Sequence, residues 1–61
     1  MNIQFTMNCD NPAFCDIPEL EAARILESLA VQICKNGLKP IQKYVLLDWD
    51  GYNVGEANVM E

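Results

Sequence analysis

Hydrophobic and polar residues alternate over residues 2–8. Ile3, Phe5 and Met7 occupy one side of this segment, and polar residues occupy the other. A period of two is typical of a β-strand with one buried face. The stretch CDNPAFCD that follows ends the strand, because its Asn-Pro pair is a turn signal and proline cannot donate to a β-ladder.

The next pattern has the period of an α-helix, and it predicts a helix over residues 17–36. We expect Asp16 to cap this helix and Glu19 to reach back to the cap, while Pro18 stands in the first turn, where its missing N–H costs nothing. Gly37 is expected to end the helix. The apolar arc that should face the sheet comprises Ala22, Ala23, Ile25, Leu26, Leu29, Ala30, Ile33 and Cys34.

Residues 41–48 and 52–60 are the remaining predicted strands, and the turn sequence DWDG separates them. A two-residue turn would pair Trp49 with Tyr52. A three-residue turn with a glycine bulge would instead pair Asp48 with Tyr52, and this register is favoured because it leaves a leucine and an asparagine together on the outer face of the sheet.

These elements predict a single α+β domain over residues 1–61, with the order β-α-β-β and one helix on a three-stranded sheet. A right-handed crossover that skips one position places the last strand in the middle, which gives an antiparallel sheet of order 1-3-2. Val54 is out of phase with the apolar residues after it, and a bulge at Gly55 would correct this. One helix covers one face, so the other face must be polar or be covered by a partner.

Charge and composition argue against several classes of function. Nine acidic residues oppose four basic ones, and the net charge of −5 disfavours direct binding to a nucleic acid backbone. No secretory signal is visible, and no apolar run approaches the ~18 residues of a membrane span. A cytoplasmic protein without membrane contact is expected.

The three cysteines do not form a recognisable reactive site. The chain has no histidine, the spacing of Cys9 and Cys15 does not fit a structural zinc site, and Cys34 lies on the apolar arc. A disulfide between Cys9 and Cys15 is conceivable, but an odd number of cysteines favours free thiols. Without a histidine base, a catalytic cysteine is not expected either. We therefore expect no metal, no cofactor and no enzymatic activity, and we interpret this stretch as a connector in which Phe14 fills the seam between helix and sheet.

The hairpin tip carries the most distinctive surface group. Trp49 stands there between Asp48 and Asp50, with Tyr52 close by. Tryptophan and tyrosine are favoured anchors of protein interfaces. In the alternative interpretation, Trp49 folds back over the open face of the sheet.

Three segments, DNPAF, EAARILESLAVQI and LLDWDGYNVGEANV, resemble a group of small, mostly uncharacterised proteins encoded by phages and prophages. The pattern of that group is a DNxAF turn, a helix of the form ARILxxLAxxI and a hairpin LxDx(N/D)GxxVG. The sequence departs from it at Cys9, Pro12, Cys15 and Trp49. The resemblance implies no catalytic residues. It implies a protein that occupies a host protein's surface, as inhibitors of bacterial immunity do, including anti-CRISPR proteins, some of which imitate the charge of DNA.

The sequence thus leads to the hypothesis of a non-enzymatic acidic binding protein that inhibits or modulates a protein of the bacterial host, with a CRISPR effector as one candidate target. The alternative is a small homodimeric structural or regulatory domain, joined through the uncovered sheet face and without an inhibitory role. The residues expected to contact the partner are Asp10, Asp16, Glu19, Asp48, Trp49, Asp50 and Tyr52.

Overall fold

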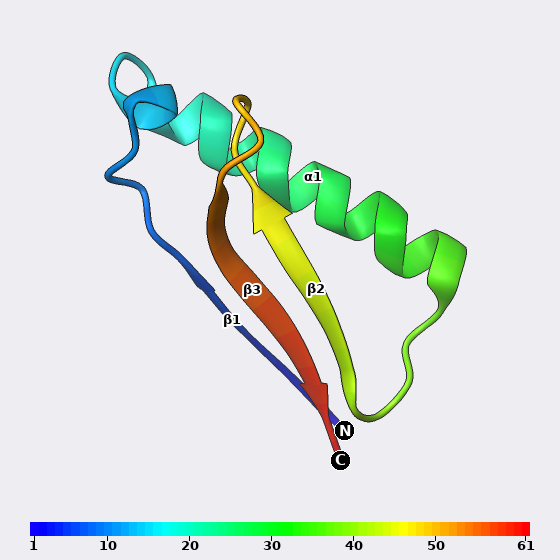
Figure 1. The fold of residues 1–61 in the computed structure, drawn as a ribbon. Coiled ribbons are helices and arrows are strands. Elements are labelled where there is room, and N and C mark those ends of the chain that lie inside the picture. Colours follow the sequence, from blue (N-terminus) through cyan, green and yellow to red (C-terminus); the bar gives the residue numbers. More distant parts are fainter.

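A computed structural model describes residues 1–61 as one helix packed on one face of a three-stranded sheet (Figure 1). The strand order is β1-β3-β2, and both neighbouring pairs are antiparallel. The predicted α+β class and the order 1-3-2 are therefore confirmed, and every predicted helix or strand agrees with the structure to within one residue at each end. The elements are β1 (Asn2–Met7), the 3-10 helix η1 (Pro12–Phe14), α1 (Pro18–Asn36), β2 (Gln42–Leu47) and β3 (Asn53–Met60).

A single small core lies between α1 and the sheet. Ile25 and Leu29 project from the helix onto β2 and β3, and Phe14 closes the end of the core, as expected for the connector. Burial of each large apolar side chain stabilises the fold by about 1.5–3 kcal/mol. No helix combines the length and the hydropathy that crossing a membrane requires. The buried apolar residues are Phe14, Ile25, Leu29, Tyr44, Leu46, Val54, Ala57 and Val59.

The start of α1 differs from the prediction. The helix begins at Pro18, its N-cap residue is Ile17, and no side chain caps it. The residue before a proline is held out of the helical region, so Ile17 must be the cap and Asp16 lies one residue too early. The expected capping box of Asp16 and Glu19 is therefore wrong, although the acid in the first turn still favours the helix dipole.

The helix is also rotated relative to its apolar arc. Its buried residues are Glu21, Ile25 and Leu29. The polar side of the helix next to this line, its polar flank, therefore faces the hairpin, and the apolar side, its lifted flank, points away from the sheet. The prediction that the whole apolar arc faces the sheet is wrong for the four residues on that lifted flank. These exposed residues are Ala23, Leu26, Ala30 and Cys34.

The β2–β3 hairpin has the favoured three-residue turn. The Asp48 N–H donates to the Tyr52 carbonyl oxygen over 2.9 Å, and the Gly51 N–H donates to the Asp48 carbonyl oxygen over 3.0 Å. Gly51 has φ +88°, a conformation that a residue without Cβ adopts readily. Leu47 then pairs with Asn53, as predicted.

The predicted bulge follows the turn, where the register shifts between Leu46 and Leu47. Leu46 pairs with Gly55, so Val54 is the extra residue, and its side chain enters the core. Gly55 lies in the central strand so close to β1 that a Cβ atom there would collide with the Thr6 carbonyl oxygen. The glycine allows the bulge and the close strand pairing to coexist.

The two faces of the sheet differ in character. Ile3 and Phe5 lie opposite Val59 and Ala57, hence on the helix side, but they are 41% and 52% exposed, so the prediction of a first strand with one buried face is wrong. Figure 1 shows the reason: α1 diverges from β1 and ends beyond β2. The open face, in contrast, is mixed. It carries an ion pair of 3.1 Å between the Lys43 ammonium and the Glu56 carboxylate, and it also exposes the apolar side chains of Val45, Leu47 and Met60. Other residues of this face are Gln4, Thr6 and Asn58.

One backbone position is strained. Ile41, in the loop between α1 and β2, has φ +61°, a region that β-branched residues rarely adopt. Its side chain is almost fully exposed and contributes nothing to the core, while its N–H donates to the Val59 carbonyl oxygen over 2.9 Å. The strand pairing thus holds an unfavourable residue in place.

Replacing Gly55 with alanine should destabilise the fold by about 2–3 kcal/mol, because β1 must move away from β3 to admit the new Cβ atom. At this chain length each 1 kcal/mol lowers the melting temperature by roughly 4–8 °C. Thermal unfolding followed by circular dichroism measures the effect. Melting temperatures equal to within a few degrees would contradict the close approach of the two strands.

Replacing Ile41 with asparagine should raise the free energy of unfolding by about 1 kcal/mol, because asparagine tolerates positive φ and no buried contact is lost. Ile41→Val is the matched control, since valine keeps the β-branch and should bring no gain. Urea denaturation of both variants provides the comparison. Equal stability of the asparagine and valine variants would show that the strain is absent.

Candidate functional site

Three segments gather at one end of the molecule: the loop that carries η1, the first turns of α1 and the β2–β3 hairpin (Figure 1). This acidic end, residues 8–24 and 48–52, holds six carboxylates and a single cation, Arg24. The difference of five negative charges equals the net charge of the whole chain, because the three lysines elsewhere balance Glu27, Glu56 and Glu61. The six acids are Asp10, Asp16, Glu19, Glu21, Asp48 and Asp50.

Asp48 organises the hairpin from inside. Only 4% of its surface is exposed, and one carboxylate oxygen accepts from the backbone N–H groups of Asp50 and Tyr52 over 3.0 and 2.8 Å. The other oxygen accepts from the Asn11 side-chain amide over 2.8 Å, which ties the hairpin to the η1 loop. The Asn11 amide, followed by the backbone donors, holds the pKa of the Asp48 carboxyl below its ordinary value.

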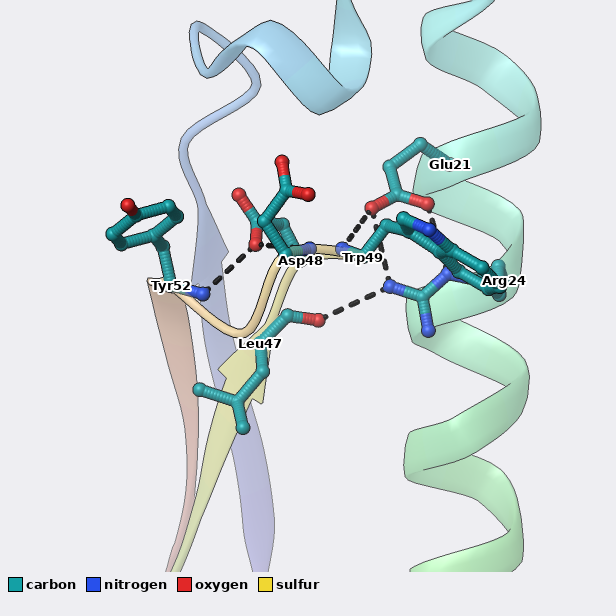
Figure 2. A network of polar contacts seen from close by, with 7 residues as sticks. Glu21, Arg24, Leu47, Asp48, Trp49 and Tyr52 are labelled. Carbon is teal, nitrogen blue, oxygen red and sulfur yellow. Dashed lines mark hydrogen bonds and ion pairs between the residues drawn. The ribbon is translucent and has the colours of Figure 1, made fainter.

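Glu21 joins the helix to the same hairpin. It is 8% exposed, and one carboxylate oxygen accepts the Trp49 N–H over 2.7 Å (Figure 2). Arg24, three residues later, forms a two-pronged ion pair with it over 2.8 and 3.1 Å. The Arg24 guanidinium, together with the Trp49 N–H, lowers the pKa of the Glu21 carboxyl.

Arg24 also supports the tip of the hairpin. Its guanidinium donates to the Leu47 carbonyl oxygen over 3.3 Å and lies 5.5 Å from the centroid of the Trp49 ring. A cation over an exposed aromatic ring stabilises the pair by about 0.5–1 kcal/mol. Trp49 therefore stands on the helix side of the hairpin, and the alternative interpretation, in which it covers the open face of the sheet, is wrong.

The residues predicted to contact a partner have different surroundings. Trp49 is 76% exposed, and Tyr52 and Asp50 beside it are exposed as well. Asp48 is the exception, because it is buried and its oxygens are occupied, so the expected direct contact is replaced by a structural role. The three remaining predicted residues, Asp10, Asp16 and Glu19, are exposed on the other two segments of the acidic end.

Glu21, Arg24 and Asn11 were not expected at this site. The sequence offers one local signal for them, because an acid and an arginine three residues apart can pair on a helix surface. It offers no signal that the pair meets the Trp49 backbone 28 residues away. Such a hydrogen bond depends on the tertiary placement of the hairpin.

Other chemistry at the acidic end is sparse. A groove of about 280 Å³ lies between α1 and β2 beside Trp49, where Arg24, Ser28 and Gln32 form part of its wall. A larger, open hollow of about 370 Å³ lies at the opposite end, around Lys43. No group of three or more histidine, cysteine, aspartate or glutamate side chains is close enough to hold a metal ion, and the three cysteines are free and exposed.

No protein-family model, curated protein or solved structure matches this chain.

Acid should weaken the structure through Asp48 and Glu21. Because their pKa values are lowered by folding, the stability that they contribute is complete above the ordinary carboxyl value of about 4 and is lost as the pH falls through the lowered values. Asp48→Asn should therefore melt at a lower temperature than the wild type near neutral pH. Its melting temperature should then fall less than that of the wild type when the pH is lowered.

The matched control is Asp50→Asn, which removes a charge from the same turn but no hydrogen bond accepted by the side chain. Its melting temperature should follow the wild-type pH dependence. Melting curves recorded from neutral pH down through the acid range test this. If the melting temperature of Asp48→Asn falls by as much on acidification as that of the wild type, Asp48 does not have the predicted role.

Proposed function

We propose that this chain is a non-enzymatic binding protein of phage or prophage origin that docks its acidic end on a basic surface of a host protein. The observation that carries the proposal is the concentration of charge: six carboxylates and one arginine lie at the end where the exposed Trp49 and Tyr52 also stand. Complementary charge speeds encounter, and buried aromatic anchors slow release.

The geometry of the tip supports an anchor role for Trp49. Its backbone is held by Glu21 and its ring is flanked by Arg24, so little conformational freedom remains to be lost on binding. An exposed aromatic side chain on a rigid turn, surrounded by charged groups, has the layout of an interface centre with a polar rim. Asp50 and Tyr52 would extend the contact on one side of the ring.

The nature of the target follows from the same charge. The exposed carboxylates suit a surface that ordinarily binds phosphates, because carboxylates and phosphates are both anions recognised by arginine and lysine. A nucleic-acid-binding protein of bacterial immunity, such as a CRISPR effector, has such a surface. In this proposal the chain inhibits it by occupying the nucleic-acid site.

The alternative of a homodimer joined through the uncovered sheet face rests on fewer observations. That face exposes the apolar side chains of Val45, Leu47 and Met60, but they share it with an ion pair between Lys43 and Glu56 and with polar side chains that water can cover.

Trp49→Ala should weaken capture of the host target by roughly 30-fold, the loss of a typical interface anchor of about 2 kcal/mol. The melting temperature should fall by only a few degrees, since the ring is largely exposed and loses only its contact with Arg24. The measurement is affinity capture from a bacterial lysate with quantitative mass spectrometry, followed by titration of the captured protein.

Val31→Ala is the matched control, because Val31 is exposed on α1 outside the acidic end and should be dispensable for capture. Capture by the wild type should also decrease as the salt concentration rises, since exposed charges are screened within ~10 Å at 0.1 M. Equal capture by the tryptophan and valine variants, or salt-independent capture, would exclude docking through the acidic end.

A further inference from the structure

Strand β1 is an edge of the sheet without the usual protection against pairing. Between Asn2 and Met7 it contains no charged residue and no proline. Natural proteins normally place a charge, a proline or a covering segment on such an edge. The other edge, β2, has two of these protections: it carries the charged Lys43, and the Arg24 side chain of α1 donates to the Leu47 carbonyl oxygen.

The backbone groups that β1 turns outward can be identified. The Asn8 N–H donates to the Val54 carbonyl oxygen, and antiparallel pairing alternates, so the even-numbered residues bond to β3. The N–H and C=O groups of Ile3, Phe5 and Met7 therefore point away from the sheet. They form an evenly spaced row of unpaired donors and acceptors.

The side chains above this edge also lack a cover. Ile3 and Phe5 lie on the helix side of the sheet, yet α1 leaves them half exposed, and Leu26 is exposed on the lifted flank of the helix. The whole chain exposes 4403 Å², whereas a monomer of 6.9 kDa typically exposes about 4,000 Å². The chain is thus less compact than a typical monomer of its mass, and the apolar side chains of Ile3, Phe5 and Leu26 are part of its exposed surface.

We propose that β1 pairs antiparallel with β1 of a second copy of this chain, about a two-fold axis at Phe5, to give a continuous six-stranded sheet. In this register Phe5 faces Phe5 of the second copy, and Ile3 of each copy faces Met7 of the other, so all pairs on the helix side are apolar. On the other side Gln4 faces Thr6, so those pairs are polar. A strand that matches itself in this way fits an identical partner, because a two-fold interface uses one patch twice.

Charge favours the same arrangement. The net charge is confined to the acidic end, beyond the Met7 end of β1, and β1 itself is uncharged. Antiparallel pairing directs the two acidic ends to opposite extremes of the dimer, separated by at least the ~20 Å length of a six-residue strand. That separation exceeds the screening length of about 8 Å at physiological salt, so two copies with a charge of −5 can associate there.

Two measurements on the unmodified protein test the proposal. Light scattering over a range of micromolar concentrations should give about twice the mass of 6.9 kDa. Amide hydrogen exchange followed by NMR should show slow exchange for Ile3, Phe5 and Met7, whose N–H groups have no partner within one copy. A monomer at all concentrations, or fast exchange at these three amides, would overturn it.

A pair of variants identifies the surface. Phe5→Lys places two ammonium groups opposite each other and should raise the dimer dissociation constant by roughly a hundredfold. Thr6→Lys is the control: Thr6 is adjacent to Phe5 but lies on the open face of the sheet, so this variant should leave the dimer intact. A dimer that persists in Phe5→Lys overturns the proposal, because the contact then lies elsewhere. If Phe5→Lys fails to fold, the amide exchange of the unmodified protein still decides.

Discussion

Two carboxylates, those of Glu21 and Asp48, hold together the three segments that form the acidic end. Asp48 closes the hairpin turn and binds the η1 loop through Asn11, while Glu21 attaches the helix to the Trp49 backbone. Neither carboxylate is free in solvent, because each accepts several hydrogen bonds and is largely buried. Their contacts orient the helix, shape the turn and determine which acids remain free for a partner.

This arrangement separates structural charge from available charge. Asp10, Asp16, Glu19 and Asp50 are exposed on surrounding segments, whereas Glu21 and Asp48 are occupied. The exposed Trp49 follows Asp48 in the turn, its N–H donates to Glu21, and its ring lies against the Arg24 guanidinium. A rigid aromatic group beside free carboxylates is the arrangement on which the proposed recognition of a basic surface rests.

Local patterns were sufficient to predict the fold. The alternation in residues 2–8, the helical period and the DWDG turn gave the elements and the strand order, and the out-of-phase Val54 gave the bulge. The errors occur where tertiary contacts override the pattern. The Glu21 carboxylate accepts the Trp49 N–H and Arg24 donates to the Leu47 carbonyl oxygen, so the polar flank of α1 faces the hairpin. The diverging helix leaves Ile3 and Phe5 uncovered. For the candidate site, the sequence indicated Trp49 and Tyr52 but not the inward orientation of Asp48, because a carboxylate in a turn can face solvent or backbone equally well.

The central claim is that two carboxylates fix the hairpin tip, and amide hydrogen exchange of Trp49, Asp50 and Tyr52 tests it most directly. All three residues lie in an exposed turn, where unbonded amides exchange rapidly. If the carboxylates of Glu21 and Asp48 accept these N–H groups, the three amides will exchange slowly in the wild type. The Trp49 amide alone will become fast in Glu21→Ala, and the other two in Asp48→Ala, because alanine leaves no side-chain oxygen to accept them. Rapid exchange of all three in the wild type would contradict the account.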